Sequence, residues 1–147
     1  MKKLLFIYNM HSGRGKIKQF LAEIIDIFVK GGYEVTAYST QSRGDATRAV
    51  KERNDSYDIV ACSGGDGTLD EVVSGMIECE NQLPIGYIPA GSTNDFAGSL
   101  GISKNMVTAA HTIVDGKEFN CDLGKFNDRV FVYVADLMVW HLFWQHI

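Results

Sequence analysis

Short strand-like segments alternate with amphipathic helical segments along this chain. Four segments predict strands from their apolar and β-favouring residues, namely 3–8, 34–39, 58–62 and 84–88. Three longer segments predict helices, namely 16–30, 45–54 and 69–79. We expect Gly31 and Gly32 to end the first helix in a left-handed cap. Asp45 is expected to cap the second helix.

Repetition of this strand-then-helix unit indicates an α/β fold. The expected architecture is a three-layer, doubly wound, mainly parallel sheet with helices on both faces. Beyond these units, short helices are predicted over 95–100 and 105–114, and a hairpin over 119–126 and 130–134. Ligands of such sheets bind beyond the carboxyl ends of the strands. The loops 9–15, 40–44, 63–68 and 89–94 all fall there, so we expect them to converge on one site.

The most informative loop reads Ser63-Gly64-Gly65-Asp66-Gly67-Thr68. A strand is predicted to end here and a helix to begin at Thr68-Leu69. The glycines would let backbone N–H groups face a ligand in conformations that a side chain forbids, and the helix N-terminus would add positive potential. These features suit the phosphates of a nucleotide. Asp66 would repel phosphates unless it binds a metal, accepts a hydroxyl proton or orients a neighbour, so the loop indicates phosphate chemistry as well as binding.

The other loops allow both a binding and a purely structural interpretation. The first loop is not a P-loop, because Met10 stands where glycine is required and Ile17 where a hydroxyl is required. Neither the first nor the third loop fits the dinucleotide pattern GxGxxG, which fails at Lys18 and Asp70. In the fourth loop, Thr93 and Asn94 could bond a phosphate or hydroxyl, or could simply cap a helix.

Composition narrows the class of protein. The chain has 147 residues, 46% of them hydrophobic and 22% charged, which suits one domain with a core. The net charge of −4 argues against a broad basic surface for nucleic acid.

The cysteines (Cys62, Cys79, Cys121) lack metal-ligand spacing and are expected to be buried thiols in a reducing cytosol. The histidines suggest no metal site, and no serine stands in a GxSxG elbow. The apolar stretch 130–147 is short for a membrane span and is interrupted by polar residues.

Three loop motifs together resemble those of the superfamily of diacylglycerol kinases, sphingosine kinases and bacterial lipid kinases, which is related to NAD kinases. The first loop, residues 9–16, resembles Asn-Pro-x-Ser-Gly-x-Gly-Lys, with Met10 in place of proline. Residues 64–72 resemble Gly-Gly-Asp-Gly-Thr-x-Asn-Glu-Val, with Asp70 in place of asparagine. Residues 89–97 resemble Pro-x-Gly-Thr-x-Asn-Asp-Phe-Ala, with Ser92 in place of threonine. Thr40 followed by 44–46, and 122–124, also match.

The resemblance implies a lipid kinase in which ATP lies across the strand ends and Mg²⁺ shields its phosphates. Asp66 would be the catalytic residue that organises the phosphate and metal region, and no metal ligand is assigned. The acceptor would be a lipid hydroxyl of diacylglycerol type, attacking the γ-phosphate in line. The implied nucleotide contacts are Asn9, Met10, His11, Ser12, Gly13, Thr40, Gly64, Gly65, Asp66, Gly67, Thr68, Leu69, Asp70, Glu71 and Thr93.

Two departures from the family pattern change the expectation. Asp70 places a negative charge where the family has a neutral amide, which should weaken ATP binding unless the side chain points away or meets the metal. The segment 136–147 does not align with the family, which continues into a second, β-rich domain with further acids and much of the lipid site. We therefore expect residues 1–135 to form an ATP-binding domain and 136–147 an atypical tail, with the second domain absent and the isolated chain nearly inactive.

Two alternatives stay open at this point. One is an NAD kinase, although the Thr93 to Phe96 motif has the lipid-kinase form. The other is a stand-alone nucleotide-binding module without catalysis. The expected location is cytoplasmic, peripheral to the membrane in a full-length protein. An exposed apolar surface near the C-terminus would also permit a homodimer.

Overall fold

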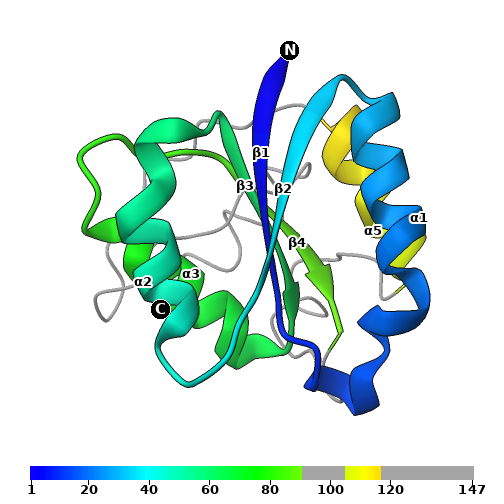
Figure 1. The fold of residues 1–147 in the computed structure, drawn as a ribbon, viewed down its shortest axis with the longest axis horizontal. Coiled ribbons are helices and arrows are strands. Elements are labelled where there is room, and N and C mark those ends of the chain that lie inside the picture. The colour runs from blue at the N-terminus through cyan, green and yellow to red at the C-terminus, as the bar shows by residue number, and fades with distance from the viewer. Residues whose placement is uncertain (91–104, 117–147) are drawn as a thin grey trace, which may run out of the picture.

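Four parallel strands form the centre of the fold in a computed structural model, which describes residues 1–90 and 105–116. They are β1 (Lys2–Tyr8), β2 (Tyr33–Ser39), β3 (Ile59–Gly64) and β4 (Ile85–Pro89). Their order in the sheet is β2-β1-β3-β4, and each neighbouring pair is parallel (Figure 1). All four carboxyl ends therefore lie at one edge of the sheet.

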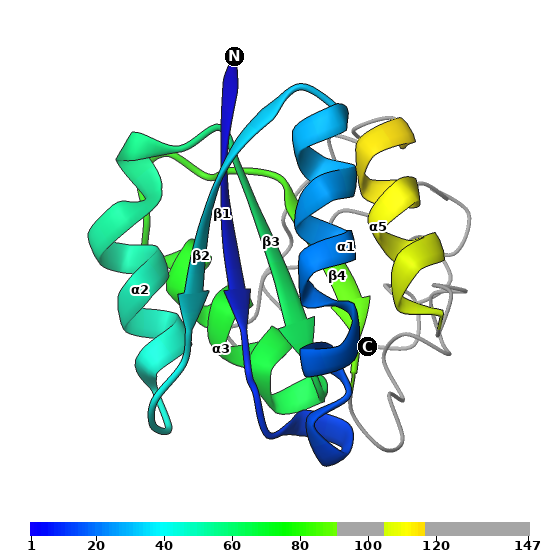
Figure 2. The same cartoon turned by 45° about the vertical axis from the view of Figure 1, so that its right-hand side comes forward.

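Helices cover both faces of this sheet. The helices α1 (Ile17–Lys30) and α5 (Met106–Asp115) pack on one face, and α2 (Asp45–Arg53) and α3 (Asp66–Ile77) pack on the other (Figures 1 and 2). Two short 3-10 helices, η1 (Ser12–Gly15) and η2 (Asn54–Ser56), lie in the connections. The predicted three-layer, doubly wound parallel fold is confirmed.

Alternation along the strands builds the two cores. On β1, Leu4 and Phe6 face α1 and α5, whereas Leu5 and Ile7 face α2 and α3. All four of these side chains are buried, because strands covered on both faces bury every residue of their centre. The central strands are thereby fixed in register, and with them the positions of the loops at their carboxyl ends.

Several predicted boundaries need correction at the strand-to-helix turns. The third strand runs on to Gly64, and the helix begins at Asp66 instead of Thr68-Leu69. Gly44, with a φ of 85°, is the N-cap of α2, and Asp45 is its first helical residue. The left-handed position that gives Gly44 this role is unfavourable for a residue with a Cβ. The predicted glycine cap after α1 is present, with Gly32 in the left-handed conformation at a φ of 97°.

The predicted helix over 105–114 is confirmed as α5. The helix expected over 95–100, the hairpin over 119–134, Thr93 and the tail 136–147 lie outside the described residues. Within the described ranges, no helix is long and apolar enough to span a membrane.

Candidate nucleotide site

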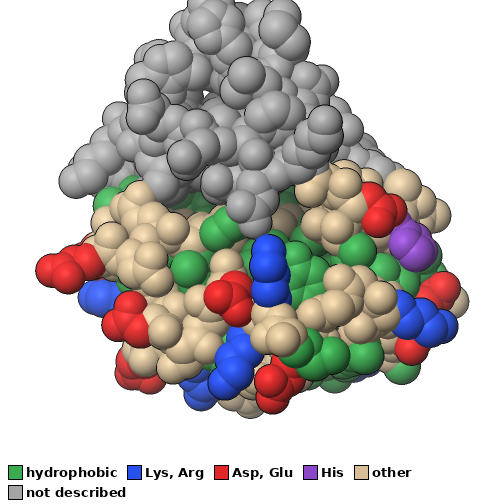
Figure 3. Space-filling view, turned by 90° about the horizontal axis from the view of Figure 1, so that it is seen from above, with side chains coloured by type: hydrophobic (Ala, Val, Ile, Leu, Met, Phe, Trp, Pro, Cys, Tyr) green, Lys and Arg blue, Asp and Glu red, His purple; other side chains and the backbone are tan. Residues whose placement is uncertain are grey.

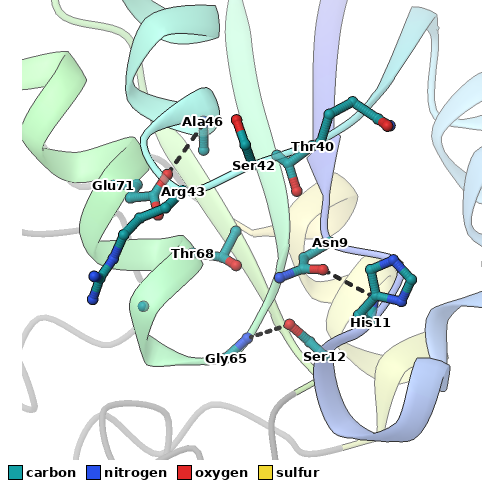
Figure 4. A pocket seen from close by; sticks show the side chains of 12 residues that line it. Asn9, His11, Ser12, Thr40, Ser42, Arg43, Ala46, Gly65, Thr68 and Glu71 are labelled. Atoms are coloured by element: carbon teal, nitrogen blue, oxygen red, sulfur yellow. Dashed lines mark hydrogen bonds between the residues drawn. The ribbon is translucent and has the colours of Figure 1, made fainter.

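A pocket of about 410 Å³, lined mainly by polar residues and glycines, opens at the carboxyl ends of β1, β2 and β3 (Figure 4). The loop after β1 and the loop after β2 form two of its walls, and the start of α3 forms the third. The lining residues are Asn9, His11, Ser12, Thr40, Gln41, Ser42, Arg43, Ala46, Gly65, Gly67, Thr68 and Glu71. The pocket thus lies where a doubly wound sheet places its ligand.

The opposite end of the sheet has a different surface. Figure 3 looks onto the face around the start of the chain, at the amino ends of the strands. Acidic and basic side chains are interspersed on the part of this face that the structure describes. The part of this surface that the structure describes therefore presents no field of a single sign to a polyanion.

Hydrogen bonds tie the first loop to the turn after β3. The backbone N–H of Asn9 donates to the carbonyl oxygen of Ser63 at 3.0 Å. The Asn9 side-chain oxygen accepts from the backbone N–H of His11 at 2.9 Å, which shapes the loop (Figure 4). The backbone N–H of Gly65 donates to the Ser12 hydroxyl at 3.4 Å. The two loops therefore form one connected wall of the pocket.

The second loop is anchored to β1 and to α3. Thr40 donates to the carbonyl oxygen of Tyr8 through its backbone N–H at 2.9 Å and through its hydroxyl at 3.3 Å. Glu71 Oε1 accepts from the backbone N–H groups of Gly44 at 3.0 Å and Ala46 at 3.3 Å. Glu71 thus connects the start of α2 to α3 while it lines the pocket.

The start of α3 supplies positive potential to the pocket. Its N-cap is Gly65, so no side chain caps the helix. An N-terminus of this kind directs backbone N–H groups and the positive end of the helix dipole at whatever lies before it. Gly65 and Gly67 both line the pocket. An anionic ligand would therefore be stabilised at this end.

None of the glycines of the turn has an unusual dihedral angle, and Gly64 is required for close packing. Gly64, Gly65 and Gly67 do not have positive φ, which corrects the expectation that they adopt forbidden conformations. A Cβ on Gly64 would lie 2.5 Å from the Thr68 hydroxyl oxygen. Glycine at 64 is required so that the first turn of α3 can approach the end of β3.

The structure brings most of the predicted nucleotide contacts together. Those that line the pocket are Asn9, His11, Ser12, Thr40, Gly65, Gly67, Thr68 and Glu71. The others that are described do not line it, namely Met10, Gly13, Gly64, Asp66, Leu69 and Asp70. Leu69 is 3% exposed and belongs to the core between the sheet, α2 and α3, while Met10 packs against the core on the α1 side.

Four lining residues were not among the predicted contacts: Gln41, Ser42, Arg43 and Ala46. They lie in or just after the loop that follows β2. The position of this loop at a strand end pointed to the site, but the polar residues Gln41 to Arg43 fit an ordinary turn equally well. No motif distinguishes them in the sequence.

The chemistry available at the site is that of binding and charge. Within the described ranges, no group of three or more His, Cys, Asp or Glu side chains is arranged to hold a metal ion. Burial raises the pKa of the Cys62 thiol to about 12, so this cysteine stays protonated and is no nucleophile at neutral pH. Burial also raises the pKa of the Tyr87 hydroxyl, which remains a hydrogen-bond donor.

Fold and pocket together define an α/β protein with a pocket at the carboxyl ends of its parallel strands. The comparisons with known proteins give the family. The chain belongs to the diacylglycerol kinase catalytic domain family, whose pattern matches residues 3–126. The resemblance drawn from the loop motifs is thereby confirmed.

Curated relatives and a solved structure agree with this assignment. The chain is 40% identical over 137 residues to a diacylglycerol kinase of Bacillus subtilis (strain 168), covering 92% of this chain and 45% of the relative. It is 39% identical over 135 residues to a diacylglycerol kinase of Staphylococcus aureus (strain MRSA252), covering 91% and 43%. A crystal structure of a diacylglycerol kinase from Bacillus anthracis str. Sterne superposes with a TM-score of 0.71 at 30% identity, covering 78% of this chain and 40% of that one. The chain spans less than half the length of these relatives.

Proposed function

We propose that this chain forms the ATP-binding part of a lipid kinase that transfers the γ-phosphate to a hydroxyl group of a diacylglycerol-like lipid. The observation that carries the proposal is the pocket itself. It joins the loop after β1, the loop after β2 and the start of α3 at the carboxyl edge of the sheet, in a member of the diacylglycerol kinase catalytic domain family.

The nucleotide would lie across the strand ends. The uncapped start of α3 and the Gly65 to Gly67 turn suit its phosphates, because an N-terminus stabilises negative charge. Ser12, Thr40 and Asn9 offer polar atoms for its hydroxyls and base. Glu71 contributes a carboxylate at the other side of the pocket, beside the β2–α2 loop, where a phosphate would be repelled.

Magnesium fits this site as a partner of the phosphates. The described residues offer no cage of three acidic or imidazole ligands, and Mg²⁺ is usually held by one or two carboxylates together with substrate phosphates and water. Asp66, the first residue of α3, is not among the lining residues but lies in sequence between Gly65 and Gly67, which are, and it would be the carboxylate that holds the ion. When bound, the ion would neutralise charge on the transferring phosphoryl group.

In the reaction, the lipid hydroxyl oxygen forms a bond to the γ-phosphorus, and the bond to the bridging oxygen breaks. ADP leaves, and the hydroxyl proton is released as the phosphate ester forms. Little covalent work falls to the protein in such transfers, so positioning and charge stabilisation are its main contributions. Asp66 would organise the phosphate and metal region. The kinase would bind its lipid substrate at a membrane surface.

A nucleotide titration tests the first half of this proposal. ATP binding to the chain is measured by calorimetry with and without Mg²⁺, for the wild type and for Ser12→Ala. Loss of the Ser12 hydroxyl should weaken ATP binding about 3- to 10-fold, as expected for one polar contact. Ser56→Ala, an exposed serine in η2, is the matched control and should bind normally. A wild-type chain without affinity for ATP would refute the proposal.

A transfer assay tests the second half. Labelled ATP is offered to a full-length protein that contains this domain, together with diacylglycerol, a sphingoid base or NAD, and the labelled product is identified. Label on diacylglycerol, abolished by Asp66→Ala, supports the lipid kinase. Label on NAD would favour the NAD kinase alternative, and ATP binding without any transfer would favour a binding module.

A further inference from the structure

Asp45 is a buried carboxylate that lies outside the pocket lining. It is 3% exposed at the first position of α2. Both of its oxygens accept from the Tyr38 hydroxyl, at 2.9 and 3.0 Å. Oδ2 also accepts from the backbone N–H of Gln41 at 2.8 Å, and Oδ1 accepts from Arg48 Nη2 at 2.9 Å. A buried charge is tolerated only when it is paired and hydrogen-bonded in this way.

The hydrogen bond from the Gln41 backbone N–H connects Asp45 to one wall of the pocket. The residues Thr40, Gln41, Ser42 and Arg43 form that wall. Gln41, Ser42, Arg43 and Gly44 are all exposed, so little apolar packing holds their backbone. Hydrogen bonds must therefore define the conformation of this loop.

Two carboxylates hold the loop at its two ends. Asp45 accepts from Gln41 at the start of the loop, and Glu71 accepts from Gly44 and Ala46 at its end. The segment between these anchors contains Ser42 and Arg43, which line the pocket (Figure 4). Glu71 also lines the pocket, whereas Asp45 does not. The hydrogen bond from Gln41 to Asp45 can therefore be tested separately from ligand contact.

The surroundings of Tyr38 keep this network in place. Tyr38 lies on β2, and the guanidinium carbon of Arg53 lies 4.5 Å from the centre of its ring. Such a cation–π contact restrains the ring, and with it the hydroxyl that donates to Asp45. The network runs from β2 through Asp45 to the backbone of the loop.

We propose that Asp45 is a positioning residue for the nucleotide pocket, because it fixes the Gln41 N–H and thereby the wall formed by 40–43. The inference rests on the proposed ATP site. It also explains why a carboxylate is buried at a place where helix capping is done by Gly44. An apolar residue of similar volume would remove the desolvation cost but would release the loop.

The test uses Asp45→Asn in the whole chain, at a temperature well below its unfolding transition. Asparagine keeps the size but loses the charge that strengthens the contacts to Gln41 and Arg48. We expect ATP to bind about 5- to 20-fold more weakly, because the neutral amide keeps part of the roughly 10- to 150-fold that one charge-assisted hydrogen bond contributes. The amide hydrogens of Gln41 and Gly44 should exchange faster by a similar factor.

Asp58→Asn is the matched control. The Asp58 carboxylate also accepts from a backbone N–H, that of Lys3 at 2.7 Å, but next to the amino ends of β1 and β3. This variant should lose stability yet bind ATP like the wild type. If Asp45→Asn behaves in the same way, with lower stability and ATP affinity within twofold of wild type, the proposal is wrong.

A milder variant covers the case in which Asp45→Asn does not fold. Tyr38→Phe removes one donor to Asp45 and should weaken ATP binding about 2- to 4-fold, in line with one neutral hydrogen bond. An unchanged affinity in this variant would also contradict the proposal. If the wild type itself does not bind ATP, the proposed function fails, and amide exchange at Gln41 in the same variants still decides whether Asp45 holds the loop.

Discussion

The hydroxyl of Tyr87 on β4 donates a 2.9 Å hydrogen bond to the carbonyl oxygen of Gly64, the last residue of β3. The backbone N–H of Ala90 donates to the same oxygen at 2.9 Å. Tyr87 is 3% exposed, so its hydroxyl has no access to bulk water as an alternative partner. The turn that leads into α3, and so into the pocket, is held from β4 as well as from the first loop.

Tyr87→Phe should destabilise the fold by about 1 kcal/mol, the usual net contribution of one such hydrogen bond. The loss should not be larger, because Ala90 still satisfies the Gly64 oxygen. Urea unfolding measures the difference. Tyr33→Phe is the control, since the Tyr33 hydroxyl makes no hydrogen bond to the rest of the described chain, and it should change stability by less than half as much. Equal effects of the two changes would contradict the role given to Tyr87.

Gly64→Ala should destabilise the fold, whereas Gly67→Ala should not. A Cβ at 64 would meet the Thr68 side chain at 2.5 to 3.0 Å, which should cost about 1–3 kcal/mol. A Cβ at 67 would meet nothing within 4 Å on a helical backbone, so alanine there should be neutral or stabilise by up to about 1 kcal/mol. Chemical denaturation of both variants provides the comparison. A stable Gly64→Ala protein would show that α3 can move away from β3 without cost.

The sequence predicts the layers of this fold well, because each strand and helix carries its own pattern. Continuous apolar runs such as Leu4 to Ile7 are typical of a strand buried on both faces, and the structure buries them there. The turn at Gly64 to Thr68 was harder to place. Glycines favour a loop by propensity, yet Gly67 is accommodated in the first turn of α3, where tertiary contacts and not propensity decide.

Only those site residues that fall in a motif or in a loop at a strand end could be predicted from the sequence. Ser12, Gly65 and Thr40 were found because they fall in such loops. Arg43 and Gln41 were missed, since their place in the pocket depends on the hydrogen bonds that the backbone N–H groups of Gln41 and Gly44 donate to Asp45 and Glu71. The role of Asp45 was likewise hidden, because an aspartate before a helix normally predicts a cap.

Asp70→Asn should change ATP affinity by less than about twofold at physiological salt. The residue departs from the family pattern, but its side chain does not line the pocket, so it acts on the phosphates only through screened long-range repulsion. ATP titrations of both proteins at low and high salt measure the effect, which should be a small tightening that salt removes. A tenfold tightening would place Asp70 in direct contact with the nucleotide or its metal.

The stability of the fold should fall in acid partly through Asp45. The guanidinium of Arg48, followed by the Gln41 N–H and the Tyr38 hydroxyl, lowers the pKa of this carboxyl below its ordinary value of 3.8. A group with a depressed pKa in the folded state stabilises the fold above its unfolded pKa, and this contribution disappears as pH falls through the folded pKa.

The difference in unfolding free energy between the wild type and Asp45→Asn should therefore be constant above about pH 5 and shrink towards about pH 2. Taking this difference cancels the contribution of the other carboxylates to the pH dependence, because they titrate alike in both proteins. Urea unfolding at a series of pH values provides the measurement, and Asp58→Asn, which leaves the Arg48 pair intact, shows whether the effect belongs to Asp45. A difference that stays the same down to the lowest pH would mean that the Asp45 carboxylate is not held in its charged form by Arg48, Gln41 and Tyr38.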